Sequence, residues 1–206
     1  CGCATRRREI CPGCLEDLPW ISAACQRCAL PLASRASTCA ACLNNPPALD
    51  RTCALWCYTD GIDRLILDFK LKADLAAGRL LSELAAESLQ RRSQRCAGPL
   101  IPMPLHPRRY RERGFNQSAL IARWLGQPVL NSLVVRRKAT PSQRGLSATK
   151  RNANVKDAFE LRQPPPRVVT LVDDVLTPGA SLNALAKCLR AGGAERIEAI
   201  TLARAI

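Results

Sequence analysis

Apolar and polar residues alternate along most of the chain in patterns typical of strands and helices. Short apolar runs predict buried strands at residues 54–58, 100–105, 129–135, 168–172 and 197–202. Apolar residues at helical spacing predict helices over residues 62–72, 75–92, 115–125 and 179–190. Because the two kinds of element follow one another in turn, we expect an α/β fold built on a parallel sheet.

The first fifty residues depart from this alternation. They consist of cysteine pairs separated by short polar or proline-containing stretches, and residues 44–47 have the composition of a linker. We therefore expect a small cysteine-rich module over residues 1–50 and a larger α/β domain over residues 51–206. Within the domain, residues 136–154 are basic and lack apolar periodicity, which predicts a long mobile loop.

Cysteine spacing indicates how the small module holds its shape. Ten of the twelve cysteines fall within the first 57 residues, where few long aliphatic runs are available for a core. Disulfides and metals are the two alternatives, and paired Cys-x-x-Cys spacing favours a metal. Two such pairs, Cys25 with Cys28 and Cys39 with Cys42, stand ten residues apart, as in a tetrahedral zinc site. Four thiolates leave no open coordination position, so this zinc is expected to be structural.

A third pair, Cys11 with Cys14, predicts a second zinc site whose other ligands come from Cys1, Cys3 or a cysteine upstream. Because residue 1 is Cys and not Met, we expect further residues before it. For the remaining cysteines, burial or an inert surface position is a sufficient explanation. These are Cys53, Cys57, Cys96 and Cys188.

Positive charge is concentrated in one block of the chain. The sequence carries 31 Lys and Arg against 17 Asp and Glu, a formal net charge of +14. Residues 91–167 hold seventeen Arg and Lys against three acidic residues, so this block accounts for the whole surplus. Such a surface favours a polyanionic partner, a diphosphate or a nucleic acid, over a face that only improves solubility. With no apolar run of eighteen residues and no leader pattern, we expect a cytoplasmic protein without membrane insertion.

An apolar strand, two aspartates and a Thr-x-Gly-x-Ser motif occur in succession over residues 168–181. The carboxyl end of a strand in a parallel sheet is where such folds bind substrates. Backbone N–H groups and the hydroxyls of Thr177 and Ser181 can surround a phosphate at the positive end of the next helix. Asp173 and Asp174 are then within reach of ribose hydroxyls. A helix cap after exposed aspartates is the alternative, but the elements in register favour a ribose 5-phosphate site.

The segment 172–181 resembles the phosphoribosyl pyrophosphate motif of type I phosphoribosyltransferases. With residues 102–109, 113–117, 140–159 and the cysteine pairs, nearly the full chain resembles the competence protein F (ComF/GntX-like) family. Two positions depart from the family pattern, which usually has Thr at Pro178 and Gly at Ala29. Pro178 removes one phosphate-facing N–H, but neighbouring donors remain.

This resemblance implies a double zinc ribbon joined to a type I phosphoribosyltransferase domain, with phosphoribosyl pyrophosphate as ligand and Mg²⁺ held by its phosphates. It implies that Asp173 and Asp174 are catalytic. The implied substrate-binding residues are Val175, Leu176, Thr177, Pro178, Gly179, Ala180, Ser181, His106, Arg109, Arg113, Arg136, Lys138 and Arg151. The implied zinc ligands are Cys1, Cys3, Cys11, Cys14, Cys25, Cys28, Cys39 and Cys42. For His106, a loop position beside a proline is favoured over acid–base work, because a leaving diphosphate needs no proton.

Two functions of different kinds remain open at this point. The chemistry of the site favours a phosphoribosyltransferase whose acceptor the sequence does not identify. The family's link to natural transformation and DNA utilisation favours a single-stranded-DNA-binding factor in which the phosphoribosyl pyrophosphate site is regulatory. With only eight aromatic residues, arginine would do most of the DNA binding. The expected partners are phosphoribosyl pyrophosphate, single-stranded DNA, and DNA-uptake or recombination proteins.

Overall fold

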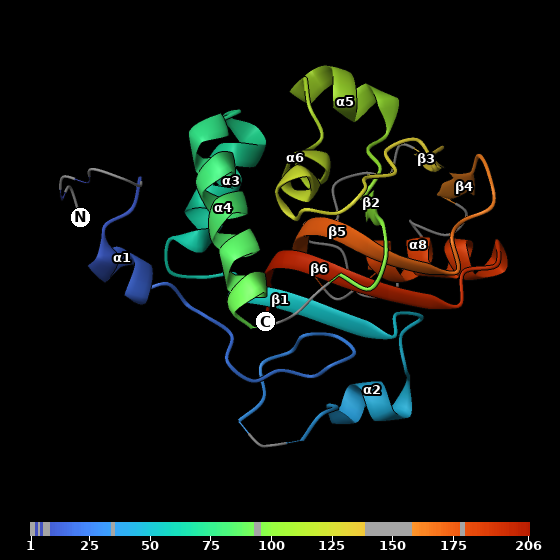
Figure 1. Ribbon diagram of the computed structural model, residues 1–206, viewed down its shortest axis with the longest axis horizontal. Helices are drawn as coiled ribbons and strands as arrows, with labels where there is room; N and C mark the ends of the chain where they lie inside the picture. Colours follow the sequence, from blue (N-terminus) through green and yellow to red (C-terminus); the bar gives the residue numbers. More distant parts are fainter. Residues whose placement is uncertain are drawn as a thin grey trace.

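A parallel sheet of four strands forms the centre of the computed structural model, which describes residues 3, 5, 9–33, 36–92, 96–138, 158–177 and 180–206. The strands follow the order β1 (Arg51–Cys57), β6 (Arg196–Arg204), β5 (Val168–Leu176) and β2 (Leu100–Pro102). Each neighbouring pair is parallel. The expected α/β fold with a parallel sheet is therefore confirmed, and Figure 1 shows the sheet between its covering layers.

Three helices cover one face of the sheet, and the sequence predicted each of them. They are α3 (Ile62–Leu71), α4 (Leu75–Arg91) and α6 (Gln117–Trp124). Asp74 begins α4, since its carboxylate accepts hydrogen bonds from the N–H groups of Ala76 and Ala77. The buried sides of the three helices form one core cluster with strand residues such as Leu55, Val172 and Leu202.

The opposite face is covered by α8 (Ala180–Ala191) and by a small antiparallel sheet of β3 (Val134–Arg136) and β4 (Phe159–Leu161). These elements form a second core cluster, to which α8 contributes Leu182 and Leu185. Ile21 and Leu49 from the cysteine-rich segment belong to the same cluster. The cysteine-rich segment therefore packs directly on the sheet.

The structure differs from the sequence predictions in several elements, of which three bear on the site. The strand expected at 168–172 continues to Leu176, because β6 pairs with β5 as far as Leu176. A helix that was not predicted, α5 (Pro107–Arg113), follows β2; its charged sequence has no apolar stripe to reveal it. The strand predicted at 129–135 is divided into an isolated bridge at Val129 and the short strand β3.

The cysteine-rich segment carries two short helices, α1 (Pro12–Glu16) and α2 (Ala40–Asn44). Its backbone runs beside β1, where Ile21 N–H donates to Leu55 O at 2.9 Å and Cys57 N–H donates to Pro19 O at 2.9 Å. Between these two bonds the Trp20 and Trp56 rings lie 5.0 Å apart. Hydrogen bonds and aromatic packing thus fix this segment to the edge strand.

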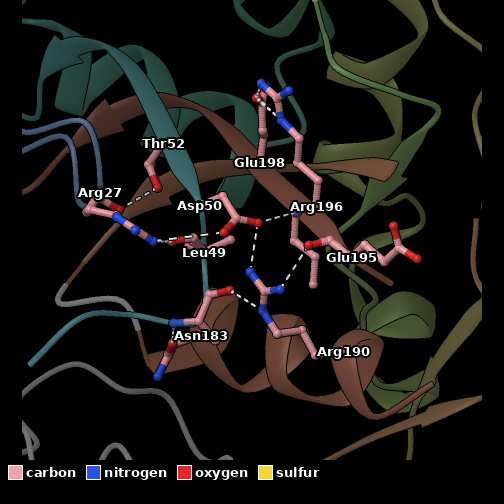
Figure 2. A network of polar contacts seen from close by, with 11 residues as sticks. Arg27, Leu49, Asp50, Thr52, Asn183, Arg190, Glu195, Arg196 and Glu198 are labelled. Carbon is pink, nitrogen blue, oxygen red and sulfur yellow. Dashed lines mark hydrogen bonds and ion pairs between the residues drawn. The ribbon is translucent and has the colours of Figure 1, made fainter. Parts of the chain in front are cut away.

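Asp50 secures the junction between the two parts of the chain. Figure 2 shows its carboxylate between Arg27 and Arg190. One oxygen lies 2.7 Å from the Arg190 guanidinium and accepts the Ile197 N–H at 2.8 Å, and the other lies 3.9 Å from Arg27. Asn183 on α8 accepts the Ala48 N–H at 2.7 Å. Residues 48–50 are therefore attached to both α8 and β6.

Gly78 allows α4 to approach α3 closely. A Cβ atom at this position would lie 2.4 Å from the ring of Phe69, which is fully buried. We expect Gly78→Ala to lower the free energy of unfolding by about 1–2 kcal/mol, because overpacking outweighs the better helix propensity of alanine. Chemical denaturation measures this change. Gly13→Ala, whose Cβ meets nothing within 4 Å, is the control, and equal stability of the two variants would contradict the prediction.

Candidate functional site

The aspartate pair lies at the carboxyl end of β5, where the chain leaves two neighbouring strands toward opposite faces of the sheet. Helix α6, the second helix after β2, packs on one face of the sheet, and α8, the helix after β5, packs on the other. Strand β2 stops pairing at Pro102, opposite Val172, so Asp173 and Asp174 extend beyond it. Parallel sheets bind ligands at such a point, where neighbouring connections diverge.

Two side chains from other elements contact the aspartates. Lys70, in the last turn of α3, places Nζ 2.6 Å from Oδ2 of Asp174. Ser118, in the first turn of α6, donates its hydroxyl to Oδ1 of Asp173 at 3.1 Å. The carboxylates also accept hydrogen bonds from the next residue's backbone, Asp173 from Asp174 N–H and Asp174 from Val175 N–H. The pair is thus held by three separate elements.

Burial and mutual repulsion make the pair sensitive to pH near neutrality. Burial raises the pKa of Asp173 to about 7, and the charge of Asp174 raises it as well, whereas Lys70, the Asp174 N–H and Ser118 lower it. Asp174 is buried, and its ion pair with Lys70 balances its charge. A cationic ligand or a set of hydroxyl donors at this place would favour the ionised form of Asp173.

Two of the expected arginines, Arg113 and Arg136, interact electrostatically with the aspartates, and a third, Arg109, interacts with both of these arginines. Burial lowers the pKa of Arg113, which the charge of Asp174 raises and the charge of Arg109 lowers. Burial also lowers the pKa of Arg136. The charge of Asp173 raises this pKa, and the charge of Arg109 lowers it. The guanidinium of Arg136 also lies 5.5 Å from the centre of the Phe159 ring. Arg109, Arg113 and Arg136 therefore place a cluster of positive charge beside the carboxylates.

The other expected substrate-binding residues lie at different places. Val175 and Leu176 belong to β5, so their backbone is part of the sheet and not of a free loop. Thr177 is exposed, and Ala180 and Ser181 begin α8; Pro178, Gly179 and Arg151 lie outside the described residues. His106 begins α5, where its Nδ1 accepts the Arg108 N–H at 3.2 Å. Lys138 is exposed, and residues 139–157 after it lie outside the described part of the chain.

Sequence reasoning missed Lys70 and Ser118. A signal for Lys70 exists, because it stands four residues after Ile66, on the side of α3 that faces the core. The sequence signal for Ser118 is weaker: it is a serine in the first turn of a helix capped by Asn116. Its burial is visible only in the structure. Neither signal identifies the aspartate that each residue contacts, because both contacts join residues far apart in the chain.

Four cysteines of the small module come together in a group that fits zinc. The Sγ atoms of Cys25, Cys28, Cys39 and Cys42 all lie within 4.8 Å of one another, and those of Cys28 and Cys39 are 3.7 Å apart. A tetrahedral zinc with bonds of about 2.3 Å would hold sulfur atoms about 3.8 Å apart. The predicted four-cysteine group is therefore assembled with a spacing that suits zinc.

The thiols of this group have unlike acidities. Burial raises the pKa of Cys25, but hydrogen bonds from the N–H groups of Cys39, Cys28 and Arg27 bring it down to about 6. Burial and contacts with the thiols of Cys28 and Cys39 raise the pKa of Cys42. Without a cation the four thiolates repel one another, and a bound Zn²⁺ would remove this penalty.

The second expected zinc site has three of its four cysteines, Cys3, Cys11 and Cys14, in the described part of the chain. Cys11 begins α1, and its Sγ accepts the Cys14 N–H at 3.5 Å. This hydrogen bond from the Cys14 backbone and contacts with the thiols of Cys14 and Cys3 lower the pKa of Cys11. Cys1 lies outside the described residues. A second zinc site with these ligands stays a prediction.

Arg204, at the end of β6, links the four-cysteine group to the aspartate strand. Its guanidinium donates to Cys28 O at 3.0 Å and to Leu176 O at 3.2 Å. The residue is only 8% exposed, so these carbonyls replace the water that a guanidinium would otherwise bind. One buried side chain thus joins the turn at Cys28 to the strand end that precedes Thr177.

The fold and the cysteine group define a class of protein, an α/β protein with a parallel sheet and an attached module that could hold zinc. No family model matches the chain. The chain is 37% identical to competence protein F of Haemophilus influenzae over 214 residues, which cover 97% of this chain and 92% of the relative. The chain therefore belongs to the competence protein F family, as its motifs indicated.

Two further relatives support this assignment. DNA utilization protein YhgH of Salmonella typhimurium is 32% identical over 206 residues, covering 96% of this chain and 91% of the relative. Competence protein ComFC of Streptococcus pneumoniae is 25% identical over 199 residues, covering 95% and 81%. Among the described residues, none of the helices has the length and apolar composition needed to cross a membrane.

Proposed function

We propose that the protein binds phosphoribosyl pyrophosphate with Mg²⁺ at the carboxyl end of β5 and acts as a phosphoribosyltransferase on an acceptor still to be identified. The observation that carries this proposal is the aspartate pair, half-buried Asp173 and buried Asp174, held by Ser118 and Lys70 directly before a Thr-x-Gly-x-Ser helix start. The relatives named for competence and DNA utilisation support a role in DNA uptake or use, and we expect the protein to act in the cytoplasm.

The residues of the site would divide the work of phosphoribosyl transfer. Asp173 and Asp174 accept hydrogen bonds from the ribose hydroxyls, and Asp174 stabilises positive charge that develops on the ribosyl ring. Residues 177–181 hold the 5-phosphate at the start of α8. Arg109, Arg113 and Arg136 neutralise the leaving diphosphate, with Lys138 and Arg151 as further contacts. His106 shapes the start of α5 and transfers no proton.

The proposed ions have separate tasks. Mg²⁺ would be held mainly by the substrate's phosphates, and the negative charge of the aspartate pair suits a cation beside them. When bound, Mg²⁺ supplies charge neutralisation for the diphosphate. Zinc at Cys25, Cys28, Cys39 and Cys42 would be structural, because four thiolates leave no coordination position for a substrate. The main test of the proposal is diphosphate release by the wild type and its loss without the two carboxylates.

A second function, single-stranded DNA binding with the phosphoribosyl pyrophosphate site as a regulator, is favoured by helix α5. This helix carries Arg108, Arg109, Arg111 and Arg113 within seven residues, and its Tyr110 is 51% exposed. Figure 1 shows α5 standing out from the sheet beyond α6. Exposed arginines bind phosphates, and an exposed tyrosine offers a surface on which a base can stack. DNA-uptake or recombination proteins would be the partners of such a factor.

We expect replacement of Tyr110 and Arg111 by alanine to weaken single-stranded DNA binding by about tenfold or more, through lost stacking and one lost phosphate contact. Fluorescence anisotropy with a labelled oligonucleotide at several salt concentrations measures the change. The slope of log affinity against log salt should become shallower by about 0.7 for the missing arginine. Arg64→Ala, an exposed arginine on α3, is the control. Absent or salt-insensitive binding by the wild type would remove this second function.

A further inference from the structure

Lys70 reaches the aspartate pair from a helix that carries none of the motifs of the site. Its Nζ lies 2.6 Å from Oδ2 of Asp174, and the two side chains are 32% and 6% exposed. Helix α3 holds this lysine firmly, because Ile66 and Phe69 are fully buried and the Phe69 ring stacks on Phe115 at 5.5 Å. The ion pair thus joins a fixed helix to the end of β5.

The neighbouring Lys72, which directly follows α3, shows what an ordinary surface lysine does. It pairs with Asp68 at 2.7 Å, one turn earlier, and its side chain is 71% exposed. Such a surface pair contributes little to stability, because water screens it and both side chains lose freedom. The pair between Lys70 and Asp174 differs in both respects, since it is largely shielded from water and joins separate elements.

The contacts of Asp174 leave its carboxylate with one orientation. Oδ1 accepts the Val175 N–H at 2.8 Å, and Oδ2 faces Lys70. Each carboxylate oxygen can accept a second hydrogen bond, so both remain open to a hydroxyl donor. The charged groups around the aspartate pair are Lys70 from α3, Arg109 and Arg113 from α5, and Arg136 from β3.

We propose that Lys70 is a positioning residue of the ribose site, where its ammonium holds the Asp174 carboxylate in place to accept a ribose hydroxyl. This inference rests on the proposed function and extends it to a residue outside its motifs. Without the ammonium, the aspartates would lose the cation that contacts Asp174 and lowers the pKa of Asp173, so Asp173 would take up a proton at a higher pH. A protonated pair offers one acceptor fewer to the ribose.

The test compares Lys70→Met, Lys70→Arg and the control Lys72→Met, which removes an equal charge from the exposed side of α3. Calorimetry gives the affinity for phosphoribosyl pyrophosphate with Mg²⁺ from about pH 6 to 9, a range that brackets the titration of the pair, and thermal melting confirms that each variant is folded. Lys70→Met should bind about tenfold more weakly at about pH 7, with the acid limb of its pH profile moved up by about one unit. Lys70→Arg should keep most of the affinity, and Lys72→Met should match the wild type.

A direct titration of the aspartate carboxyls by carbon-13 NMR separates this inference from the function on which it rests. In Lys70→Met, the first proton should bind the pair at a higher pH than in the wild type. If the wild type binds no phosphoribosyl pyrophosphate, the proposed function fails, and the titration still decides the role of Lys70 at the pair. The inference is overturned if the aspartate carboxyls of Lys70→Met titrate as in the wild type. It is also overturned if Lys70→Met binds phosphoribosyl pyrophosphate with the wild-type affinity and pH profile.

Discussion

Replacing Asp173 and Asp174 together with asparagine is expected to reduce diphosphate release from phosphoribosyl pyrophosphate by about a hundredfold or more. Asparagine keeps the size of each side chain but removes two negative charges that face the ribose and the cations of the site. A developing ribosyl cation would then meet Lys70 and three arginines without any compensating carboxylate. A coupled pyrophosphatase assay measures the release, with bases, ammonia and nucleosides as acceptors, each with and without single-stranded DNA.

The control for this experiment is Asp17→Asn, which removes an exposed carboxylate at the end of α1. This variant should release diphosphate at the wild-type rate. Calorimetry distinguishes a transferase from a sensor, because a wild type that binds phosphoribosyl pyrophosphate but releases no diphosphate with any acceptor has a regulatory site. Equal release by the wild type and the double variant would contradict the assignment of these two residues.

Replacing Cys39 with serine is expected to lower the free energy of unfolding by about 3 kcal/mol or more, because the variant loses one of four zinc ligands. For a chain of this size, that change corresponds to a fall in melting temperature of about 6–12 °C. Differential scanning calorimetry measures it. Chelation should lower the melting temperature of the wild type by a similar amount and leave the variant almost unchanged.

Cys96→Ser is the matched control for the zinc prediction, since Cys96 is half-buried and lies outside both cysteine groups. The destabilisation should reach the sheet, because the module shares the core cluster of Ile21 and Leu49 and pairs its backbone with β1. A single, earlier unfolding transition is therefore expected. A melting temperature equal to that of Cys96→Ser would show that the four thiolates hold no structural metal.

Periodicity predicted the central elements of the fold because their burial is regular. The helix α3 buries Ile62, Ile66 and Phe69 at helical spacing, and β5 begins with a buried run that is apolar except for Thr170. Helix α5 was not predicted because none of its residues is buried, so its sequence has no apolar residues at helical spacing. The strand β4 was missed for a different reason, since three residues that pair only with β3 are too few to show an alternation.

The motifs located the aspartate pair but could not supply its surroundings. Asp173 and Asp174 stand out because their spacing to Thr177 and Ser181 is local. Their contacts with Ser118 and Lys70 span long stretches of chain and depend on how α6 and α3 pack on the sheet. A single sequence records the local spacing of residues, whereas the electrostatic balance of a buried site arises only from packing.

Arg204 sets a limit on how freely the parts of this protein could be exchanged between relatives. Its buried guanidinium needs the carbonyl of Cys28 on one side and that of Leu176 on the other. A foreign module grafted before β1 would have to present a carbonyl at the same point, or leave one N–H of this buried guanidinium without its acceptor. The turn at Cys28 and the last strand would therefore have to be exchanged together, although almost the whole chain separates them.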